Sequence, residues 1–288
     1  MENKNIKFAF FGTPHVASET LLVLINNGYI PSIIITSPDK KSGRGMQLNP
    51  TKVSILAHEY NIPCLKIEKI DQEFIDEFKN FKIDLSIVVA YGKILPEELI
   101  NSPKFGTINI HYSLLPKYRG ASPLEQALLL GDKKTGISIQ QMVFKLDSGP
   151  IITKKEILID INEDKETLRN KLVKLGANTL IEILPKIITQ EINPEIQDES
   201  NSSYCKKIKK EDGQIDIING NDLENYNKYR AYSGWPGVYF FAIKNGKNIR
   251  IKITKAIYEN NSFIIKRVIP EGKKEVNYSD FLNSNISL

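Results

Sequence analysis

The sequence contains little cysteine and little histidine, and both shortages bear on metal and disulfide chemistry. Cys64 and Cys205 are the only cysteines in 288 residues, which is too few for a disulfide framework or a cysteine-based zinc site. His15, His58 and His111 lie far apart, with neither HxxxH nor HxH spacing. We therefore expect no bound metal ion.

Long apolar runs and targeting segments are also missing. No stretch approaches the roughly 20 apolar residues that a membrane helix needs. The opening residues "MENKNIKFAFFGTP" enter a strand-like run almost at once, which leaves no room for a signal peptide or an Arg-rich transit peptide. Two thiols without a pairing framework suit a reducing compartment. We expect a cytoplasmic protein that does not contact a membrane.

Excess charge of either sign is missing from the first two thirds of the chain. The net charge is +5. From Tyr204 to the end, 15 Lys and Arg stand against 9 Asp and Glu, whereas the preceding residues carry 24 against 25. The whole positive excess thus falls in the C-terminal segment, as expected if that segment faces a polyanion. A lysine-rich solvated surface would give the same count.

The dinucleotide-binding fingerprint GxGxxG is absent as well. Gly12 in "FFGTPHVA" has no second glycine at the required spacing, so a nicotinamide cofactor is not predicted. What is present is an alternation of apolar β-rich runs with helical periodicity. Strands are expected within residues 6–12, 30–37, 62–67, 84–92, 106–113 and 135–143, and helices within 16–27, 51–61, 71–81 and 122–132.

Several of these strand runs are apolar on both faces, which is typical of a mostly parallel sheet covered by helices on each side. We predict a doubly wound α/β domain over residues 1–189. Its last helix is expected to begin with Asn162 as the N-cap. Residues 190–203 have the composition of a linker, and 204–288 are predicted to form a small all-β domain with a hairpin at "IKNGKN".

The stretch "INIHYSLLPKYRG" places polar residues on an apolar strand. Strand side chains alternate between faces, so Asn109, His111 and Ser113 share one face. A doubly wound fold binds its ligand at the carboxyl ends of the strands, where these residues fall. Asn109 and His111 can donate hydrogen bonds to one developing oxyanion, and Asp147 can hold the imidazole. A buried hydrogen-bond network without catalytic function remains open at this point.

A basic loop from Ser37 to Asn49 follows the second expected strand. It carries Lys40, Lys41 and Arg44, with Arg44 between two glycines. Such a hook can reach a phosphate or a base edge. A solvated flexible loop is the competing interpretation.

Six separated motifs together resemble the folate-dependent formyltransferases. They are "FFGTPHVA", "SPDKKSGRG", "VVAYGKILPEEL", "NIHYSLLPKYRGASPLEQALLLGDKKTGISI" and "LDSGPI" in the first domain and "YRAYSGWPGVYF" in the second. The SLLP tetrapeptide after Asn-x-His is the most specific of them. The GRG loop, "KIKKEDGQIDI" and the last motif are similar to those members that formylate methionyl-tRNA. The resemblance spans essentially the whole chain.

The resemblance implies a formyltransferase domain that uses 10-formyltetrahydrofolate and an OB-like C-terminal barrel that helps to hold initiator tRNA, in a monomer without metal. By motif, the catalytic positions are Asn109, His111 and Asp147. The folate-contacting positions are Ser113, Leu114, Leu115, Pro116, Tyr91, Gly92, Ile94 and Leu95. The expected tRNA contacts are Arg44, Lys40, Lys41, Lys206, Lys207, Lys209 and Lys210.

Two departures from the family pattern lie close to these positions. Tyr112 stands where a small residue is common, so we expect an altered fit around the formyl group, and Gln140 departs, with Val143, from the usual "MQMD"-like continuation. A formyltransferase acting on a sugar nucleotide or another small amine, a hydrolase that releases formate and a non-catalytic RNA-binding module are the alternatives. The first two would share the catalytic residues. The third is disfavoured because the triad is intact.

Overall fold

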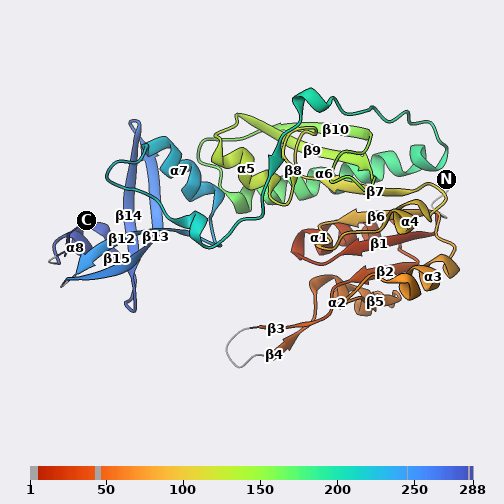
Figure 1. Cartoon of the computed structure of the whole chain (residues 1–288), viewed down its shortest axis with the longest axis horizontal. Coiled ribbons are helices and arrows are strands. Elements are labelled where there is room, and N and C mark those ends of the chain that lie inside the picture. The colour runs from red at the N-terminus through yellow and green to blue at the C-terminus, as the bar shows by residue number, and fades with distance from the viewer. Residues whose placement is uncertain (1–5, 43–46, 245, 285, 288) are drawn as a thin grey trace. The chain divides into compact units, whose positions relative to one another are not determined.

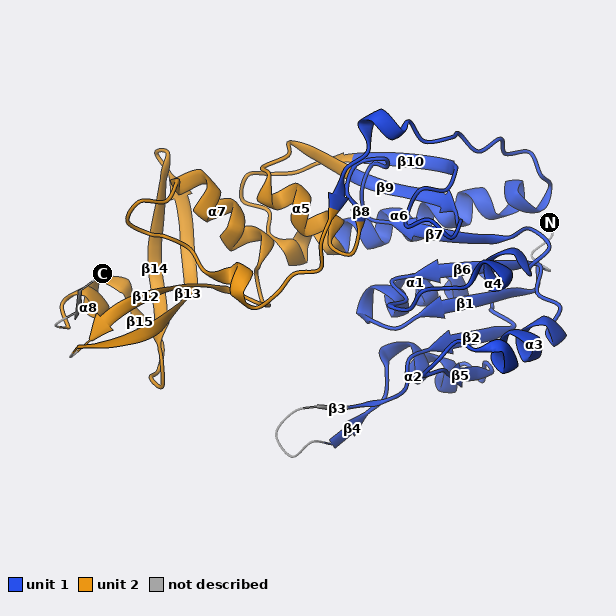
Figure 2. Ribbon diagram, in the orientation of Figure 1, with its two compact units in different colours: residues 1–119, 136–156, 170–204 blue, residues 120–135, 157–169, 205–288 orange. Residues whose placement is uncertain are grey.

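The chain folds into two compact units, shown in Figure 2. The computed structural model describes residues 6–42, 47–244, 246–284 and 286–287. The first unit comprises residues 1–119, 136–156 and 170–204, and the second comprises 120–135, 157–169 and 205–288. Each unit is therefore built from several stretches of the chain.

The first unit is organised around a seven-stranded sheet with the order β10-β9-β7-β6-β1-β2-β5 (Figure 1). Strands β1, β2, β5, β6 and β7 run parallel, and β9 is antiparallel to β7. The order reverses between β1 and β6, which is the topological switch point where such sheets bind ligands. The strands are β1 (Phe8–Gly12), β2 (Ile33–Thr36), β5 (Cys64–Lys66), β6 (Leu85–Val89), β7 (Thr107–His111), β9 (Lys134–Gln141) and β10 (Ile151–Leu158).

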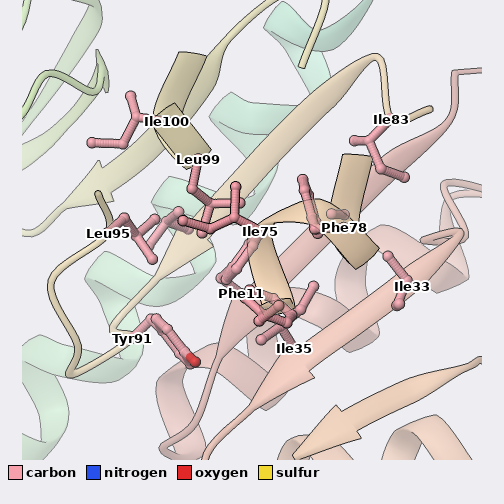
Figure 3. Packing of buried hydrophobic residues seen from close by; sticks show 13 residues of the cluster. Phe11, Ile33, Ile35, Ile75, Phe78, Ile83, Tyr91, Leu95, Leu99 and Ile100 are labelled. Atoms are coloured by element: carbon pink, nitrogen blue, oxygen red, sulfur yellow. The ribbon is translucent and has the colours of Figure 1, made fainter. Parts of the chain in front are cut away.

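Helices cover both faces of this sheet, as the doubly apolar strands predicted. On one face, Phe11 and Ile35 pack against Phe74 and Phe78 of α3 and Leu99 of α4 (Figure 3). On the other face, Gly176 of α6 lies against Ile110 of β7. The helices associated with the first unit are α1 (His15–Asn26), α2 (Lys52–Glu59), α3 (Gln72–Asn80), α4 (Glu97–Asn101) and most of α6 (Lys165–Ile188). The α/β fold class is confirmed.

Gly12 ends β1 directly before α1. A Cβ atom at this position would lie 2.6 Å from the Cβ of Ala17 and 3.1 Å from the carbonyl oxygen of Val89. The absence of a side chain thus allows α1 and β6 to approach the carboxyl end of β1 closely. The glycine of "FFGTPHVA" has a packing reason that needs no dinucleotide.

The edge strand of the main sheet and a short two-stranded hairpin were not foreseen in the sequence. The stretch "IITKKEIL" forms the edge strand β10, and the basic loop contains a short hairpin of β3 (Lys40–Ser42) and β4 (Gln47–Asn49). In β10 the middle residues are exposed, so the apolar run typical of a central strand is missing. Edge strands are the least visible in a hydrophobicity pattern for this reason.

The start of α6 differs from the expectation by two residues. Asp164, not Asn162, is the N-cap, because its Oδ1 accepts a hydrogen bond from Thr167 N at 3.0 Å. Thr167 Oγ1 in turn accepts from Asp164 N at 3.1 Å, so each residue satisfies a donor of the other. Burial raises the pKa of the Asp164 carboxyl, but hydrogen bonds from Thr167 and Ser233 outweigh it, and the net pKa lies below its usual value.

The second unit contains a five-stranded sheet with the order β15-β14-β13-β12-β16. Its named pairs are antiparallel, and the predicted hairpin joins β12 to β13 with Lys244 opposite Lys247. β13 is interrupted by register shifts between Ile253 and Ala256, which bend a long strand as a barrel-like sheet requires. The strands are β12 (Val238–Lys244), β13 (Lys247–Glu259), β14 (Ser262–Pro270), β15 (Val276–Asn277) and β16 (Ile286–Ser287).

The expectation that residues 204–288 would be all-β was wrong, because they also contain α7 (Asp222–Ala231) and α8 (Tyr278–Leu282). The second unit further includes α5 (Pro123–Leu129), which was expected as a helix. The buried side of α7 includes Asn225, Asn227 and Arg230, so its sequence shows no apolar stripe. Arg230 donates to the backbone carbonyls of Asp160 and Glu163 at 3.1 and 3.2 Å. Buried polar contacts replace the hydrophobic periodicity that would have revealed the helix.

Short strands and single-turn helices lie in and near the segments where the chain passes from one unit to the other. β8 (Arg119–Gly120) and β11 (Tyr204–Cys205) form a two-stranded sheet. Two single-turn 3₁₀ helices lie at Glu199–Asn201 and Glu211–Gly213. Throughout the described part of the chain, none of the helices combines the length and apolar character needed to cross a membrane.

Candidate active site

Asn109 and His111 lie on one face of β7, as the alternation predicted. In the antiparallel pairing with β9, Asn109 stands opposite Gln140 and His111 opposite Ser138. Directly paired residues of neighbouring strands point to the same face, so four polar side chains gather beside one another. Ser138 and Gln140 are 0% and 2% exposed. This polar group lies next to the switch point, since β7 adjoins β6.

His111 is held by contacts at both ring nitrogens. Nε2 lies 2.8 Å from the carbonyl oxygen of Tyr118, which accepts only, so the proton is assigned to Nε2. Nδ1 lies 3.7 Å from Oδ2 of Asp147, which is an ion-pair distance and too long for a hydrogen bond. When Nδ1 carries a proton as well, it can therefore donate to a third group placed between the ring and the carboxylate.

Asp147 reaches this position from the loop between β9 and β10. Its Oδ1 accepts a hydrogen bond from Gln140 Nε2 at 2.8 Å, which leaves Oδ2 on the side of His111. Two residues later, a Cβ atom on Gly149 would lie 1.7 Å from the carbonyl oxygen of Gln141. Only glycine fits there, and the close passage of the loop over β9 is what brings Asp147 to the sheet.

Asn109 is oriented by its neighbours in the sheet. Its Nδ2 donates to the carbonyl of Val88 at 3.0 Å, and its Oδ1 faces Gln140 Nε2 at 3.5 Å. Because Gln140 donates toward the oxygen, the amide is fixed with its nitrogen on the other side. That nitrogen carries two hydrogens, and the bond to Val88 uses one.

The loops around the site contain three non-glycine residues in the left-handed region. They are Ala90 after β6, Tyr118 after the SLLP turn, and Asp147, with φ of 48°, 60° and 46°. Such conformations cost free energy for residues with a Cβ and persist where the surrounding structure holds them. Tyr118 and Asp147 are the two residues that contact the imidazole. The backbone strain thus coincides with the polar group on β7 and β9.

The SLLP turn is held to β9 by hydrogen bonds. Ser113 Oγ donates to Lys117 O at 2.6 Å. Ser138 Oγ donates to Ser113 O at 2.7 Å and accepts from Leu115 N at 2.9 Å. Leu115 is 1% exposed, whereas Leu114 and Pro116 are half-buried. Ser113 and Leu115 therefore shape the turn, and the other two residues present the surface.

The loop after β6 contains the other expected folate contacts. Tyr91 lies at the edge of the buried cluster in Figure 3, with its ring 5.5 Å from that of Phe11. Burial raises the pKa of Tyr91 to about 12, and its hydroxyl has no hydrogen-bond partner among the described residues. Leu95 is buried in the same cluster, whereas Ile94 is 81% exposed. Nothing would contact a Cβ on Gly92.

These features fit a partly aromatic, partly polar ligand such as a folate. A buried hydroxyl without a partner is unfavourable in isolation. Gln140 Oε1 is likewise buried without a partner in the part of the chain that the structure describes. A ligand that accepts from Tyr91 or donates to Gln140 would satisfy these atoms.

The expected tRNA contacts are only partly described. Arg44 lies outside the described residues, and Lys40 is exposed in β3 beside Lys41. Four exposed lysines follow β11 in the second unit, at positions 206, 207, 209 and 210. The described structure therefore places the C-terminal lysines in solvent and leaves the arginine hook untested.

The expectation for Tyr112 was wrong. Its side chain points away from Asn109 and His111, into the other face of the sheet, where its ring approaches Gly176 of α6. Thr20 and Glu19 of α1 also lie near its hydroxyl. Strand alternation separates it from the polar group on β7, so a bulky residue here does not alter the space beside Asn109.

Gln140 was noted in the sequence only as a departure, and Gln197 was not noted. A signal for the first was present: Ser138 and Gln140 alternate with isoleucines in "ISIQQ" as Asn109 and His111 do in "INIH". Two polar alternations in neighbouring strands predict one shared polar face. Nothing in the local sequence marks Gln197, because its contacts are all distant along the chain.

Comparisons with known proteins identify the family of this chain. Residues 4–184 match the family described as formyl transferase, and residues 207–264 match its C-terminal domain. The methionyl-tRNA formyltransferase of Sulfurihydrogenibium sp. (strain YO3AOP1) is 39% identical over 94% of this chain and 86% of its own. That of Thermotoga neapolitana is 40% identical over 89% of this chain and 81% of its own.

A solved structure shares the fold. The sugar 3N-formyl transferase WlaRD, crystallised with dTDP and 5-N-formyl-THF, has a TM-score of 0.63 over 93% of this chain and 99% of its own, at 20% identity. At that identity the similarity concerns the fold alone. Sequence identity with the curated relatives is about twice as high and extends through both units. The chain belongs to the formyl transferase family and, within it, to the methionyl-tRNA formyltransferases.

Proposed function

We propose that this enzyme transfers the formyl group of 10-formyltetrahydrofolate to the α-amino group of methionine esterified to initiator tRNA, for translation initiation. The observation that carries the proposal is the convergence of Asn109, His111 and Asp147 beside the switch point, with the 3.7 Å gap between His111 Nδ1 and Asp147 Oδ2. The kinship with methionyl-tRNA formyltransferases supports the choice of acceptor.

Asn109 and His111 stabilise the negative charge that develops on the formyl oxygen. Asn109 Nδ2 retains one hydrogen beside its bond to Val88. With its Nε2 proton donated to Tyr118 O, His111 can also donate from Nδ1 when the ring is charged. A preorganised donor of this kind contributes about 3 kcal/mol to lowering the barrier.

Asp147 orients the imidazole and directs the proton. Its carboxylate Oδ2 lies 3.7 Å from His111 Nδ1. The attacking amine adds to the formyl carbon and gives a tetrahedral oxyanion, and the bond from that carbon to the folate nitrogen then breaks. One proton must pass from that amine to the departing nitrogen, and a water held between Asp147 and His111 can relay it. No covalent intermediate with the enzyme is required.

The folate co-substrate supplies an activated one-carbon unit at the formyl oxidation level. The residues that would hold it are those of the SLLP turn, Ser113, Leu114, Leu115 and Pro116, and those of the loop after β6, Tyr91, Gly92, Ile94 and Leu95. Ser113 and Leu115 act through the shape of the turn. Tyr91 offers a neutral hydroxyl donor, since burial keeps its pKa near 12.

The tRNA contacts are proposed on charge. The basic loop residues Lys40, Lys41 and Arg44 would approach the acceptor end of the tRNA. Phosphates of the tRNA would be bound by Lys206, Lys207, Lys209 and Lys210. Phosphate contacts position a nucleic acid without reading its sequence. The positive excess of the C-terminal segment supports this part of the proposal.

A direct acceptor comparison tests the function. Purified protein is incubated with 10-formyltetrahydrofolate and either charged initiator tRNA or a dTDP-amino sugar, and formylated product is measured in each. We expect formyl-methionyl-tRNA only, and the Asn109→Ala variant serves as the negative control. Formylation of the sugar in preference to the tRNA would refute the proposed acceptor. Release of formate without any acceptor would indicate a hydrolase.

A further inference from the structure

The segment that follows α6 packs closely on the first unit. Glu195 and Ile151 form two backbone hydrogen bonds. Glu195 N donates to Ile151 O at 2.8 Å, and Ile151 N donates to Glu195 O at 2.7 Å. Two residues later the side chain of Gln197 is 6% exposed. A polar stretch with the composition of a linker is therefore fixed against β10 and turns one glutamine inward.

All the polar atoms of the Gln197 side chain are used. Its Nε2 donates to the carbonyl oxygens of Asp147 and Gly149 at 3.0 and 2.7 Å. Its Oε1 accepts from Arg119 Nε and Nη2 at 3.1 and 2.8 Å. Carbonyls accept and a guanidinium donates, so this orientation of the amide is the one that satisfies every partner. Arg119 itself is 0% exposed.

The same segment also holds the turn that contacts the imidazole. Tyr118 N donates to Ser203 Oγ at 2.9 Å, and Arg119 N donates to Ser203 O at 2.8 Å. Tyr118 is the residue whose carbonyl accepts from His111. One stretch of seven residues, from Gln197 to Ser203, is thus hydrogen-bonded both to the backbone of the Asp147 loop and to the backbone of the turn at Tyr118, which contacts His111.

The loop that carries Asp147 needs such support. Between Val143 and Leu146 its side chains are exposed, and Asp147 has a left-handed backbone with φ of 46°. A strained residue in an exposed loop keeps its conformation when surrounding groups hold it. Gln197 binds the carbonyls on both sides of Ser148 and thereby fixes the direction in which the Asp147 side chain leaves the backbone.

We propose that Gln197 is a positioning residue of the active site, which holds the Asp147 loop against Arg119 so that the carboxylate faces His111. This inference rests on the proposed function and deepens it. Gln197 touches neither substrate nor the reacting atoms; it acts through Asp147. A residue of the polar segment that follows α6 would then help to form the active site.

Two substitutions separate the two halves of the Gln197 amide. Gln197→Glu keeps an acceptor for Arg119 but loses the donor to both carbonyls. Gln197→Met keeps the length of the side chain and removes both interactions. Glu199→Gln is the matched control, because Glu199 also binds Arg119 through Nη1 and Nη2, at 3.0 and 3.1 Å, yet is 57% exposed. Its link to the Asp147 loop is an exposed ion pair with Lys145 at 3.3 Å, and such surface pairs contribute little to holding a loop.

For both Gln197 variants we expect kcat for methionyl-tRNA formylation to fall by about 10- to 100-fold, since small misplacements of catalytic groups have effects of this size. KM for each substrate should change less than about 3-fold, because only an interaction that matters in the transition state is lost. Glu199→Gln should retain the wild-type kcat. Wild-type turnover in Gln197→Glu would overturn the inference.

A double-mutant cycle distinguishes positioning from a general structural role. In an Asp147→Asn background, Gln197→Glu should lower kcat by less than about 2-fold, because the group that it positions has already been removed. An equal loss in both backgrounds would show that Gln197 acts on stability or packing instead, and would refute the proposal.

Amide hydrogen exchange supplies a readout that does not depend on the reaction. In Gln197→Glu we expect faster exchange in the peptide 142–150 and unchanged exchange in β1 and β6. If the wild type fails to formylate tRNA while this exchange difference is present, the proposed function fails and the loop positioning stands. Unchanged exchange at 142–150 would refute the positioning whatever the reaction is.

Discussion

Tyr91→Phe is expected to change stability and folate affinity in opposite directions. The Tyr91 hydroxyl is buried without a hydrogen-bond partner among the described residues, and its side chain is 7% exposed. An unsatisfied buried polar group costs about 1–3 kcal/mol. Removing one oxygen atom leaves the ring contact with Phe11 in place, so the free protein should gain stability by about 1 kcal/mol, at the low end of that range.

For the folate complex the sign reverses. If the bound ligand accepts a hydrogen bond from Tyr91, its loss should weaken binding by roughly 0.5–1.5 kcal/mol, or about 2- to 10-fold in the dissociation constant. Burial raises the pKa of Tyr91 to about 12, so the hydroxyl stays neutral across an ordinary assay range. Both effects should therefore be independent of pH there.

The assay combines thermal unfolding of the free protein with calorimetric titration of a formyl-folate analogue. A gain of about 1 kcal/mol corresponds to roughly 2–4 °C in Tm for a domain of this size. Tyr112→Phe is the control, because its hydroxyl lies on the far face of the sheet, beside Thr20, and its loss should leave folate affinity unchanged. A less stable Tyr91→Phe protein with unaltered folate affinity would refute the reasoning.

Four further predictions follow from the site and its surroundings. Asn109→Ala and His111→Ala should each lower the single-turnover rate of formylation by about 100-fold with folate affinity largely kept; wild-type rates would remove the oxyanion role. Gly149→Ala should lower kcat by at least about 10-fold, since its Cβ would overlap the carbonyl oxygen of Gln141 at 1.7 Å and displace the Asp147 loop. Neutralising the four lysines that follow β11 should weaken tRNA binding and make its dependence on salt less steep; an unaltered slope would remove them from the interface. Because hydrogen bonds outweigh burial and lower the pKa of Asp164, its stabilising contribution should be present above the pKa of an unfolded aspartate and be lost as pH falls through the folded value, so the Tm difference between wild type and Asp164→Asn should shrink in acid.

The sequence was most informative where a pattern repeats locally. The doubly apolar runs and the helical periodicities between them gave six strands and four helices of the predicted domain, because each of those elements buries a face that its own residues define. Strand alternation likewise placed Asn109 and His111 together without reference to the rest of the chain. α7 and β10 were missed because buried amides and an arginine in one, and an exposed edge in the other, erase that pattern.

By itself, then, the sequence determined the fold class, the family and the polar face of β7, since these depend on residue order and short-range spacing. Only the tertiary structure decided which atoms meet there. Tyr112 turns to the other side of the sheet, Gln140 takes one oxygen of Asp147, and Gln197 ties the Asp147 loop to Arg119. These contacts join residues up to 78 positions apart. Such contacts form only when distant segments are packed together, so no local sequence pattern predicts them.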